Sequence, residues 1–222
     1  MNEFFKRIDA LRVPIREHFN PWLGKFRVKK LNDPNFTLIS NNCWGGHVYR
    51  YFNLPYLSPT IGLYFIADDY VRFVSDLRHY INSEIEFINA KNSHNYEKLL
   101  EQGSTSVPIG LLGGDVEIVF LHSHSIEEAR TKWKRRCERI NWDNIIIKFS
   151  EQNYAEQKHL KTVDDLPYKK KIILTSHDYG LKSQVLFKEW EGCPQIPDEI
   201  THFRRYVNLT NLVNGFQFTD SR

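Results

Sequence analysis

The stretch Asn144-Ile-Ile-Ile-Lys-Phe-Ser150 decides the fold class, because it is a short and almost unbroken apolar run. A second run of the same kind, Lys171-Ile-Ile-Leu-Thr-Ser176, follows it further along the chain. Strands with one face in water alternate between apolar and polar residues, whereas strands of a parallel sheet are covered on both faces and read as continuous apolar runs. These two runs therefore predict an α/β protein with a parallel sheet.

Helical and strand patterns alternate over the rest of the chain. The other expected strands span residues 36–40, 60–66, 84–89 and 116–122, and the expected helices span 44–54, 68–82, 96–102, 125–140, 155–163 and 199–213. Ser125, followed three residues later by Glu128, has the spacing of a capping box. We predict an open, mostly parallel sheet of about five strands with helices on both faces.

Residues 2–19 carry apolar side chains at helical spacing with basic residues between them, which predicts an amphipathic N-terminal helix. Pro14 should bend or interrupt this helix, because proline lacks the backbone N–H. Such a helix either docks on the protein body or a second subunit, or lies on an acidic membrane surface. We assign residues 1–30 to this helix and its lead-in, and residues 31–222 to a single α/β domain.

The composition is that of an ordinary folded protein, with 222 residues, 41% hydrophobic and 26% charged. The net charge of +3 is only mildly basic, so we expect no nucleic-acid partner. Cys43, Cys137 and Cys193 are odd in number and form no CxxC motif, which argues against a disulfide framework or a structural zinc site. No window is apolar enough for a signal peptide or a spanning helix, so we expect a cytoplasmic protein.

Polar side chains follow several of the expected strands, where ligands bind in an open α/β sheet. They are Asn41, Asn42, Cys43, Trp44, Gly45, Gly46 and His47 after 36–40; His122 and His124 after 116–122; Ser150, Glu151 and Gln152 after 144–150; and His177 and Asp178 after 171–176. We expect Asn41, Asn42, Trp44, Gly45, Gly46, His124, His177 and Asp178 to bind substrate.

Cys43 is the candidate nucleophile, because a helix N-terminus lowers the pKa of a thiol. His47 or His122 would then be the base, and backbone N–H groups around Gly45 and Gly46 would bind an oxyanion. The alternative is that Cys43 is a small buried apolar residue at a tight corner. His122 and His124 share a face of a strand, as metal ligands do, but no nearby carboxylate completes a ligand set, so we predict no metal.

Three segments resemble a known bacterial family in order and spacing. They are SNNCWGGHVYRYFNLPYLSPTIGLYF (residues 40–65), FLHSHSIEEARTKWKRRCERINWDN (residues 120–144) and LPYKKKIIL (residues 166–174). Together they resemble the family named domain of unknown function 1919, over about residues 30–215. The chain departs from that pattern at Ser123, where the family has tyrosine after the first histidine, which puts His124 in doubt as a shared site residue.

Members of that family resemble proteins encoded in capsule and exopolysaccharide gene clusters. The resemblance therefore implies a cytoplasmic α/β protein with a role in surface-glycan assembly. It transfers no catalytic residues. A looser similarity links the Asn41-Asn42-Cys43 turn to capsule acetyltransferases that have a Gly-Asn-Cys turn and bind coenzyme A. These resemblances imply a carbohydrate or sugar-nucleotide substrate.

Three functions follow from these expectations, and the sequence leaves open whether the protein is an enzyme. The first is an acyl or acetyl transferase of capsule or exopolysaccharide biosynthesis that acts on a sugar, with a coenzyme A thioester as donor. The second is a nucleotide-sugar-dependent glycosyl or phospho-sugar transferase, with Asp68 and Asp69 beside a divalent ion unless they only start a helix. The third is a non-catalytic subunit of the glycan assembly machinery, peripheral at the inner face of the membrane and reaching it or a partner through residues 1–19.

Overall fold

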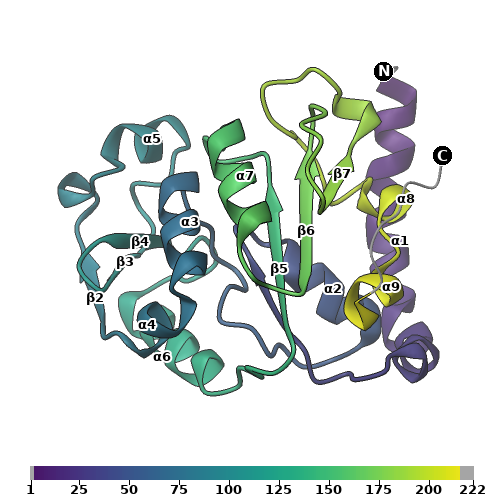
Figure 1. Ribbon diagram of the computed structural model, residues 1–222, viewed down its shortest axis with the longest axis horizontal. Helices are drawn as coiled ribbons and strands as arrows, with labels where there is room; N and C mark the ends of the chain where they lie inside the picture. Colours follow the sequence, from purple (N-terminus) through teal and green to yellow (C-terminus); the bar gives the residue numbers. More distant parts are fainter. Residues whose placement is uncertain (1–2, 216–222) are drawn as a thin grey trace.

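The computed structural model describes the backbone of residues 3–215 and the side chains of residues 14, 15 and 17–215 (Figure 1). The strands are β1 (Thr37–Ser40), β2 (Ile85–Ile88), β3 (Ile109–Leu112), β4 (Val116–Val119), β5 (Ile145–Ser150), β6 (Lys170–Thr175) and β7 (Gln184–Leu186). The helices are α1 (Glu3–Arg27), α2 (Trp44–Phe52), α3 (Ala67–Ser75), α4 (Leu77–Asn82), α5 (Tyr96–Glu101), α6 (Ile126–Cys137), α7 (Gln157–Asp165), α8 (Phe203–Tyr206) and α9 (Leu209–Asn214). Short 3₁₀ turns are η1 (Val28–Lys30), η2 (Ala90–Asn92) and η3 (Lys188–Trp190).

The main sheet has the strand order β1-β5-β6-β7, and every neighbouring pair is parallel. Alternate residues of β5 belong to different hydrophobic clusters: Ile147 packs in the cluster that contains α3 and α7, and Ile146 packs in the one that contains α2 and α9. Because successive strand residues point to opposite faces, burial of both faces requires consecutive apolar residues. The prediction of a parallel sheet with helices on both faces is confirmed.

The parallel sheet has four strands, fewer than the five expected. Residues 60–66 do not form a strand of this sheet; only an isolated antiparallel bridge joins Tyr64 to Val119. The segment expected as a strand over 116–122 ends at Val119 and pairs antiparallel in a separate sheet, ordered β2-β3-β4. Gly113 and Gly114, with φ of +60° and +85°, make the turn that folds β4 back on β3. This local hairpin takes β4 out of the parallel sheet.

Several helices differ from their expected bounds. The helix expected over 68–82 breaks at Asp76, which adopts a non-helical conformation and caps α4 by accepting from the His79 N–H. The helix expected over 199–213 is two short helices, α8 and α9. The cap of α6 is as predicted, because Ser125 Oγ accepts from the Glu128 N–H at 3.1 Å.

Helix α1 continues through Pro14 and Pro21, so the interruption expected at Pro14 is wrong. Both prolines are exposed, and water at the surface can hydrogen-bond the carbonyl that a proline leaves unpaired. The apolar residues expected on its first turns, Phe4, Phe5, Ile8 and Leu11, lie outside the described side chains. Among the described helices, none is both long and apolar enough to cross a bilayer.

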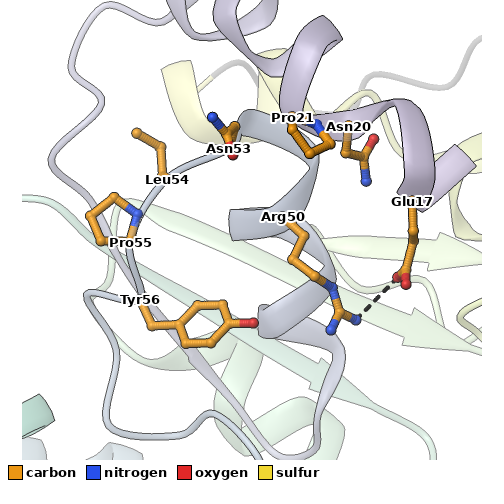
Figure 2. Close-up of a pocket in the computed structure, with 8 residues that line it drawn as sticks. All are labelled: Glu17, Asn20, Pro21, Arg50, Asn53, Leu54, Pro55 and Tyr56. Carbon is orange, nitrogen blue, oxygen red and sulfur yellow. Dashed lines mark ion pairs between the residues drawn. The ribbon is translucent and has the colours of Figure 1, made fainter.

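One face of α1 packs on α2. Gly24 lies so close to Asn53 that a Cβ added to the glycine would come within 2.5 Å of the Asn53 Cβ. Glu17 of α1 pairs with Arg50 of α2 at 3.1 Å, at the edge of a small surface cavity of about 240 Å³ (Figure 2). This close approach fixes α1 along the margin of the molecule (Figure 1).

Candidate functional site

A cavity of about 350 Å³ opens where the chain leaves the carboxyl ends of β1 and β5. Its lining comes from six separate segments: Asn42, Cys43 and Trp44; Tyr64; Gln102 and Ser104; Leu121; Gln152 and Asn153; and Pro197, Asp198, Glu199 and Ile200. Four side-chain amides, those of Asn42, Gln102, Gln152 and Asn153, contribute to its polar lining. The position agrees with the rule that ligands bind beyond the carboxyl ends of parallel strands, so the Asn42–Trp44 turn belongs to a cavity and is more than a corner.

A buried ion pair lies at the base of this cavity. Lys148 of β5 donates to Glu199 Oε1 at 2.7 Å and to Asn42 Oδ1 at 2.9 Å, and its side chain has no exposed surface. The Asn42 amide also donates to Glu199 Oε1 at 2.8 Å and to Gln152 Oε1 at 2.6 Å. Ser150 Oγ donates to the other oxygen of Glu199. The network ties the first loop, β5 and the segment before α8 into one unit.

Burial lowers the pKa of Lys148 to about 8, against the attraction of the Glu199 carboxylate, which raises it. The ammonium form therefore dominates at neutral pH. A buried ammonium paired with a carboxylate and an amide oxygen has its hydrogen bonds satisfied. We conclude that the pair first serves to fix Asn42 and Glu199 where they line the cavity.

Cys43 lines the cavity but is not poised as a thiolate. Burial raises its pKa, although the nearby Lys148 ammonium opposes the change. Its Sγ donates to the Leu63 carbonyl at 3.7 Å, and within the described part of the chain no histidine is hydrogen-bonded to it. The thiol form therefore dominates near neutral pH, and a nucleophilic role would require substrate binding to lower this pKa.

Two backbone donors near the expected oxyanion site have protein acceptors. The Trp44 N–H donates to Asn42 Oδ1 at 3.1 Å, and the Gly46 N–H donates to the Cys43 carbonyl at 3.2 Å. Gly45 has a packing reason, because an added Cβ would lie 3.0 Å from Leu38 and 3.2 Å from Ile61. Gly45 therefore allows α2 to pack closely on Leu38 and Ile61, whereas Gly46 has room for a methyl group, and neither glycine lines the cavity.

The Asn41 side chain links the ends of β1 and β5. Its side chain accepts from the Ser150 N–H at 3.1 Å and donates to the Ser150 carbonyl at 3.2 Å. It has no exposed surface. It therefore replaces a backbone pair at the end of the β1–β5 ladder, and it does not line the cavity.

The candidate bases lie elsewhere. His47 pairs with Glu17 at 2.9 Å on the α1 side of α2, and burial together with Arg50 lowers its pKa against the effect of Glu17. His122 and His124 are exposed and follow β4, a strand of the antiparallel sheet. We expected these two histidines at the edge of the parallel sheet because the strand that precedes them was expected to belong to that sheet. None of the three lines the cavity.

His177 and Asp178 follow β6 but also lie outside the cavity lining. His177 Nδ1 lies 3.0 Å from Glu151 Oε1, which also accepts from the Tyr179 hydroxyl at 2.6 Å. The Ser176 N–H donates to the other Glu151 oxygen at 2.6 Å. Since Glu151 is 2% exposed, this cluster serves to bind the loop after β6 to the end of β5.

Two polar atoms of the residues that line the cavity, Trp44 Nε1 and the Tyr64 hydroxyl, lack a hydrogen-bond partner among the described residues. Trp44 is fully buried, and its Nε1 donor has no acceptor among the described residues. The Lys148 ammonium lies 5.4 Å from the centre of the same indole ring. A buried donor without an acceptor costs free energy, and a ligand oxygen in the adjoining cavity would remove that cost.

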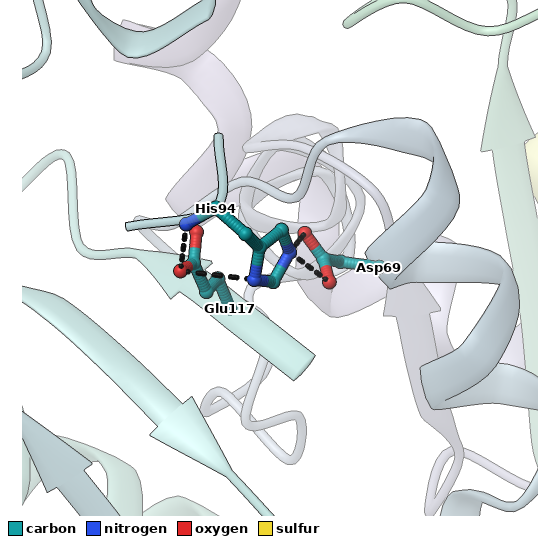
Figure 3. Close-up of side chains that lie close together, drawn as sticks. All are labelled: Asp69, His94 and Glu117. Atoms are coloured by element: carbon teal, nitrogen blue, oxygen red, sulfur yellow. Dashed lines mark hydrogen bonds and ion pairs between the residues drawn. The ribbon is translucent and has the colours of Figure 1, made fainter. Parts of the chain in front are cut away.

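A second cluster lies away from this cavity lining, between α3, the loop before α5 and β4 (Figure 3). His94 Nε2 lies 3.1 Å from both Asp69 oxygens, and His94 Nδ1 lies 3.1 Å from Glu117 Oε1. Asn95 donates to both carboxylates, at 2.6 and 3.1 Å. Asp69 is completely buried, and burial raises its pKa. Each ring nitrogen of His94 therefore faces a different carboxylate.

The same three residues offer one ligand atom each within 4.8 Å of one another, as a metal site requires. The sequence reasoning considered Asp69 beside Asp68, but Asp68 pairs instead with His159 at 2.9 Å. His94 and Glu117 gave no local signal, because they are far from Asp69 in the chain.

Reasoning from sequence missed the residues that form most of the cavity. Lys148 had a signal, since it is the one charge in the apolar run of β5. Gln152 was among the residues expected at the strand ends, and it lines the cavity. Glu199 and Asp198 had no comparable signal, because an irregular segment carries them back to the sheet edge.

The chain is similar to a known protein and matches one protein family. The chain is 30% identical over 199 residues to an uncharacterized protein of Haemophilus influenzae (strain ATCC 51907 / DSM 11121 / KW20 / Rd), covering 89% of this chain and 88% of that protein. The family model described as Domain of unknown function (DUF1919) matches residues 15–220. That span includes the main sheet and the entire cavity lining. The chain belongs to the DUF1919 family.

Proposed function

We propose that this protein is a transferase of capsule or exopolysaccharide assembly, and that the cavity beyond β1 and β5 binds its sugar. The observation that carries the proposal is the unpartnered Trp44 Nε1 donor in a cavity lined by side-chain amides. Carboxamides both donate and accept, as sugar hydroxyls do. The volume of about 350 Å³ is at the small end of ligand sites and suits one sugar ring.

Asp198 is our candidate for the base that accepts the proton of the sugar hydroxyl. It lines the cavity, and one of its carboxylate oxygens accepts from the Thr201 N–H at 3.0 Å. Glu199 is less suited, because Lys148, Asn42 and Ser150 all donate to it. In our proposal the hydroxyl oxygen bonds to the acyl carbon of a coenzyme A thioester, its proton passes to Asp198, and the C–S bond breaks with its electron pair on sulfur.

Direct transfer of the acyl group from the thioester to the sugar is consistent with Cys43 as a thiol. A covalent acyl-enzyme would need a thiolate, whereas burial raises the pKa of this thiol. Cys43 is therefore proposed as a part of the sugar-binding wall. The role in glycan assembly is supported by the resemblance of residues 40–65 and 120–144, and a location in the cytoplasm is supported by three free thiols.

The second candidate is transfer from a nucleotide sugar. The Asp69–His94–Glu117 cluster favours it, because a divalent ion bound there would compensate two buried carboxylates and could assist a phosphorylated donor. Activity that requires magnesium or manganese would select this alternative. A non-catalytic subunit would bind sugar without any turnover.

The test is ligand binding by calorimetry and thermal shift with monosaccharides, acetyl-coenzyme A and nucleotide sugars. Trp44→Phe removes the N–H and keeps an aromatic ring, so we expect sugar affinity to fall about tenfold with little loss of thermal stability. Asp198→Asn should abolish transfer while leaving sugar binding within about threefold. Gln102→Ala, in the cavity, should weaken binding, and its matched control Gln157→Ala, an exposed amide on α7, should not. Sugar affinity that Trp44→Phe leaves unchanged would contradict the proposal.

A further inference from the structure

Helix α1 carries an uncovered apolar stripe. Ile15, Phe19, Trp22 and Phe26 are 57%, 53%, 63% and 54% exposed, although each is large and apolar. Their spacing of four, three and four residues places them within an arc of about 60° on a helix with about 100° per residue. Isolated exposed apolar residues are ordinary, but a continuous stripe of this kind marks an interaction surface.

The stripe points away from the protein body. The opposite face of α1 carries Glu17, Asn20 and Gly24, which contact or approach α2 (Figure 2). Asn20 is buried, and its side chain accepts from Arg27 at 2.7 Å. The fold therefore holds α1 by its polar face and leaves the apolar face outward, the reverse of a surface helix that covers a core.

Positive charge is concentrated in the same region. Residues 1–30 contain eight lysines and arginines against three acidic residues, whereas the whole chain has a net charge of only +3. Lys25 is exposed on one side of the stripe, and Lys29 and Lys30 are exposed in the 3₁₀ turn that follows α1. Glu17, the acidic residue nearest to the stripe, is paired with Arg50 and His47. Among the described side chains of α1, no acidic one lies beside the stripe.

A basic cavity of about 610 Å³ lies beside the end of α1. Arg27 and Arg204 both stack on the ring of Tyr51, with guanidinium carbons 3.9 and 4.8 Å from its centre. Burial lowers the pKa of Arg27, and the Arg204 charge adds to this effect against that of Tyr51. No carboxylate of the described residues pairs with either guanidinium. Lys30 completes a cationic wall that suits a phosphate group.

We propose that this face binds an anionic lipid surface. The stripe enters the boundary between headgroups and acyl chains, Lys25, Lys29 and Lys30 contact anionic headgroups, and the basic cavity accepts a lipid phosphate. A second copy of the chain is a poorer occupant, because two such helices would bring their flanking cations together. The inference does not depend on the proposed transferase activity.

The experiment is flotation of the purified full chain with vesicles of phosphatidylcholine, either pure or containing about 30% phosphatidylglycerol. We expect binding to the anionic vesicles alone, and weaker binding as salt is raised. Phe19→Glu/Trp22→Glu should reduce binding at least tenfold, because it places charge in the stripe. Lys25→Glu/Lys29→Glu should do the same without removing an apolar side chain, and Arg204→Gln should weaken binding about threefold.

The matched control is Leu100→Glu/Ile126→Glu, which adds the same charges at two exposed apolar residues of α5 and α6 (Figure 1). It should bind vesicles as the wild type does. The proposal is overturned if the wild type does not float with anionic vesicles, or if the stripe variant floats equally well. A dimer in solution that the stripe variant dissociates, with no flotation of the wild type, would replace the lipid by a second copy.

Discussion

Lys148 Nζ lies 2.7 Å from Glu199 Oε1, and the two residues are 51 positions apart in the chain. Both side chains are buried, and Asn42 and Ser150 complete their hydrogen bonds. The pair joins the centre of the parallel sheet to the irregular segment that closes the candidate site. Its geometry therefore couples the stability of the fold to the shape of the cavity.

Removing one charged member of this pair should lower the free energy of unfolding. Lys148→Met leaves the Glu199 carboxylate buried without its countercharge, so we expect the free energy of unfolding to fall by about 3–5 kcal/mol. Lys148→Met/Glu199→Gln removes both charges and should lose less than the single variant. Urea denaturation followed by circular dichroism measures both. A double variant less stable than the single one would contradict this account.

The pKa of Lys148 should be measurable directly. Burial lowers it to about 8 from 10.5, so lysine side-chain NMR should show one resonance that titrates near pH 8. Between these values the unfolded state holds a proton that the native state has lost, so this group makes the free energy of unfolding rise with pH. Its contribution is lost as pH falls through the folded pKa. Glu199→Gln should lower the pKa further, and an unchanged titration near 10.5 would refute the burial argument.

Cys43 should react slowly. Because burial raises its pKa, iodoacetamide should alkylate it at pH 7.5 at least about tenfold more slowly than it alkylates N-acetylcysteine. Mass spectrometry of the digested protein gives the rate at this site. A rate equal to or above that of the free amino acid would restore Cys43 as a candidate nucleophile, and full turnover of Cys43→Ala would exclude it.

Removal of the His94 side chain should destabilise the cluster of Asp69, His94 and Glu117. His94→Ala leaves Asp69 and Glu117 buried with Asn95 as their shared donor, so we expect a loss of about 1–3 kcal/mol in the free energy of unfolding. Glu117→Gln in the His94→Ala background should recover part of the loss, because it removes one of two like charges. Thermal denaturation with and without manganese completes the test. Additive losses in the double variant would argue against coupling through His94.

The contact of α1 with α2 should be sensitive to one methyl group. Gly24→Ala places a Cβ within 2.5 Å of Asn53, so α1 must shift, and we expect a loss of about 1–3 kcal/mol. The matched control is Gly46→Ala, a helical glycine whose added Cβ would lie 3.6 Å from Ile61. Limited proteolysis should cleave the region around residue 24 faster in Gly24→Ala and leave the control unaffected. Equal protection of both variants would show that the contact is not close.

Local patterns were enough for the fold class, and they placed three residues at the cavity that we propose as the site. The runs around Ile147 and Ile173 predicted buried parallel strands, because a strand covered on both faces needs apolar residues at consecutive positions. The edge rule then predicted a site after β1, and Asn42, Cys43 and Trp44 do line the cavity. Both inferences rest on the local order of apolar and polar residues, which a short stretch of sequence is enough to show.

Such side-chain patterns do not predict which strands pair with one another. Residues 60–66 and 116–119 have strand-like composition, but a pattern of side chains does not name the neighbour that pairs with them. The hairpin at Gly113 and Gly114 turns β4 onto β3, and this placement took His122 and His124 out of the edge of the parallel sheet. The expected position of these histidines was therefore wrong because the strand before them belongs to the antiparallel sheet.

The amino-acid sequence by itself determined a parallel α/β core, the cap of α6 and the polar turn after β1, because hydrophobic period and capping are local properties. Only the tertiary structure decided that Lys148 meets Glu199, that Asp69 meets His94 and Glu117, and that the apolar stripe of α1 faces outward. Each of these depends on which distant segments the chain brings together. That choice is made by the packing of the complete core.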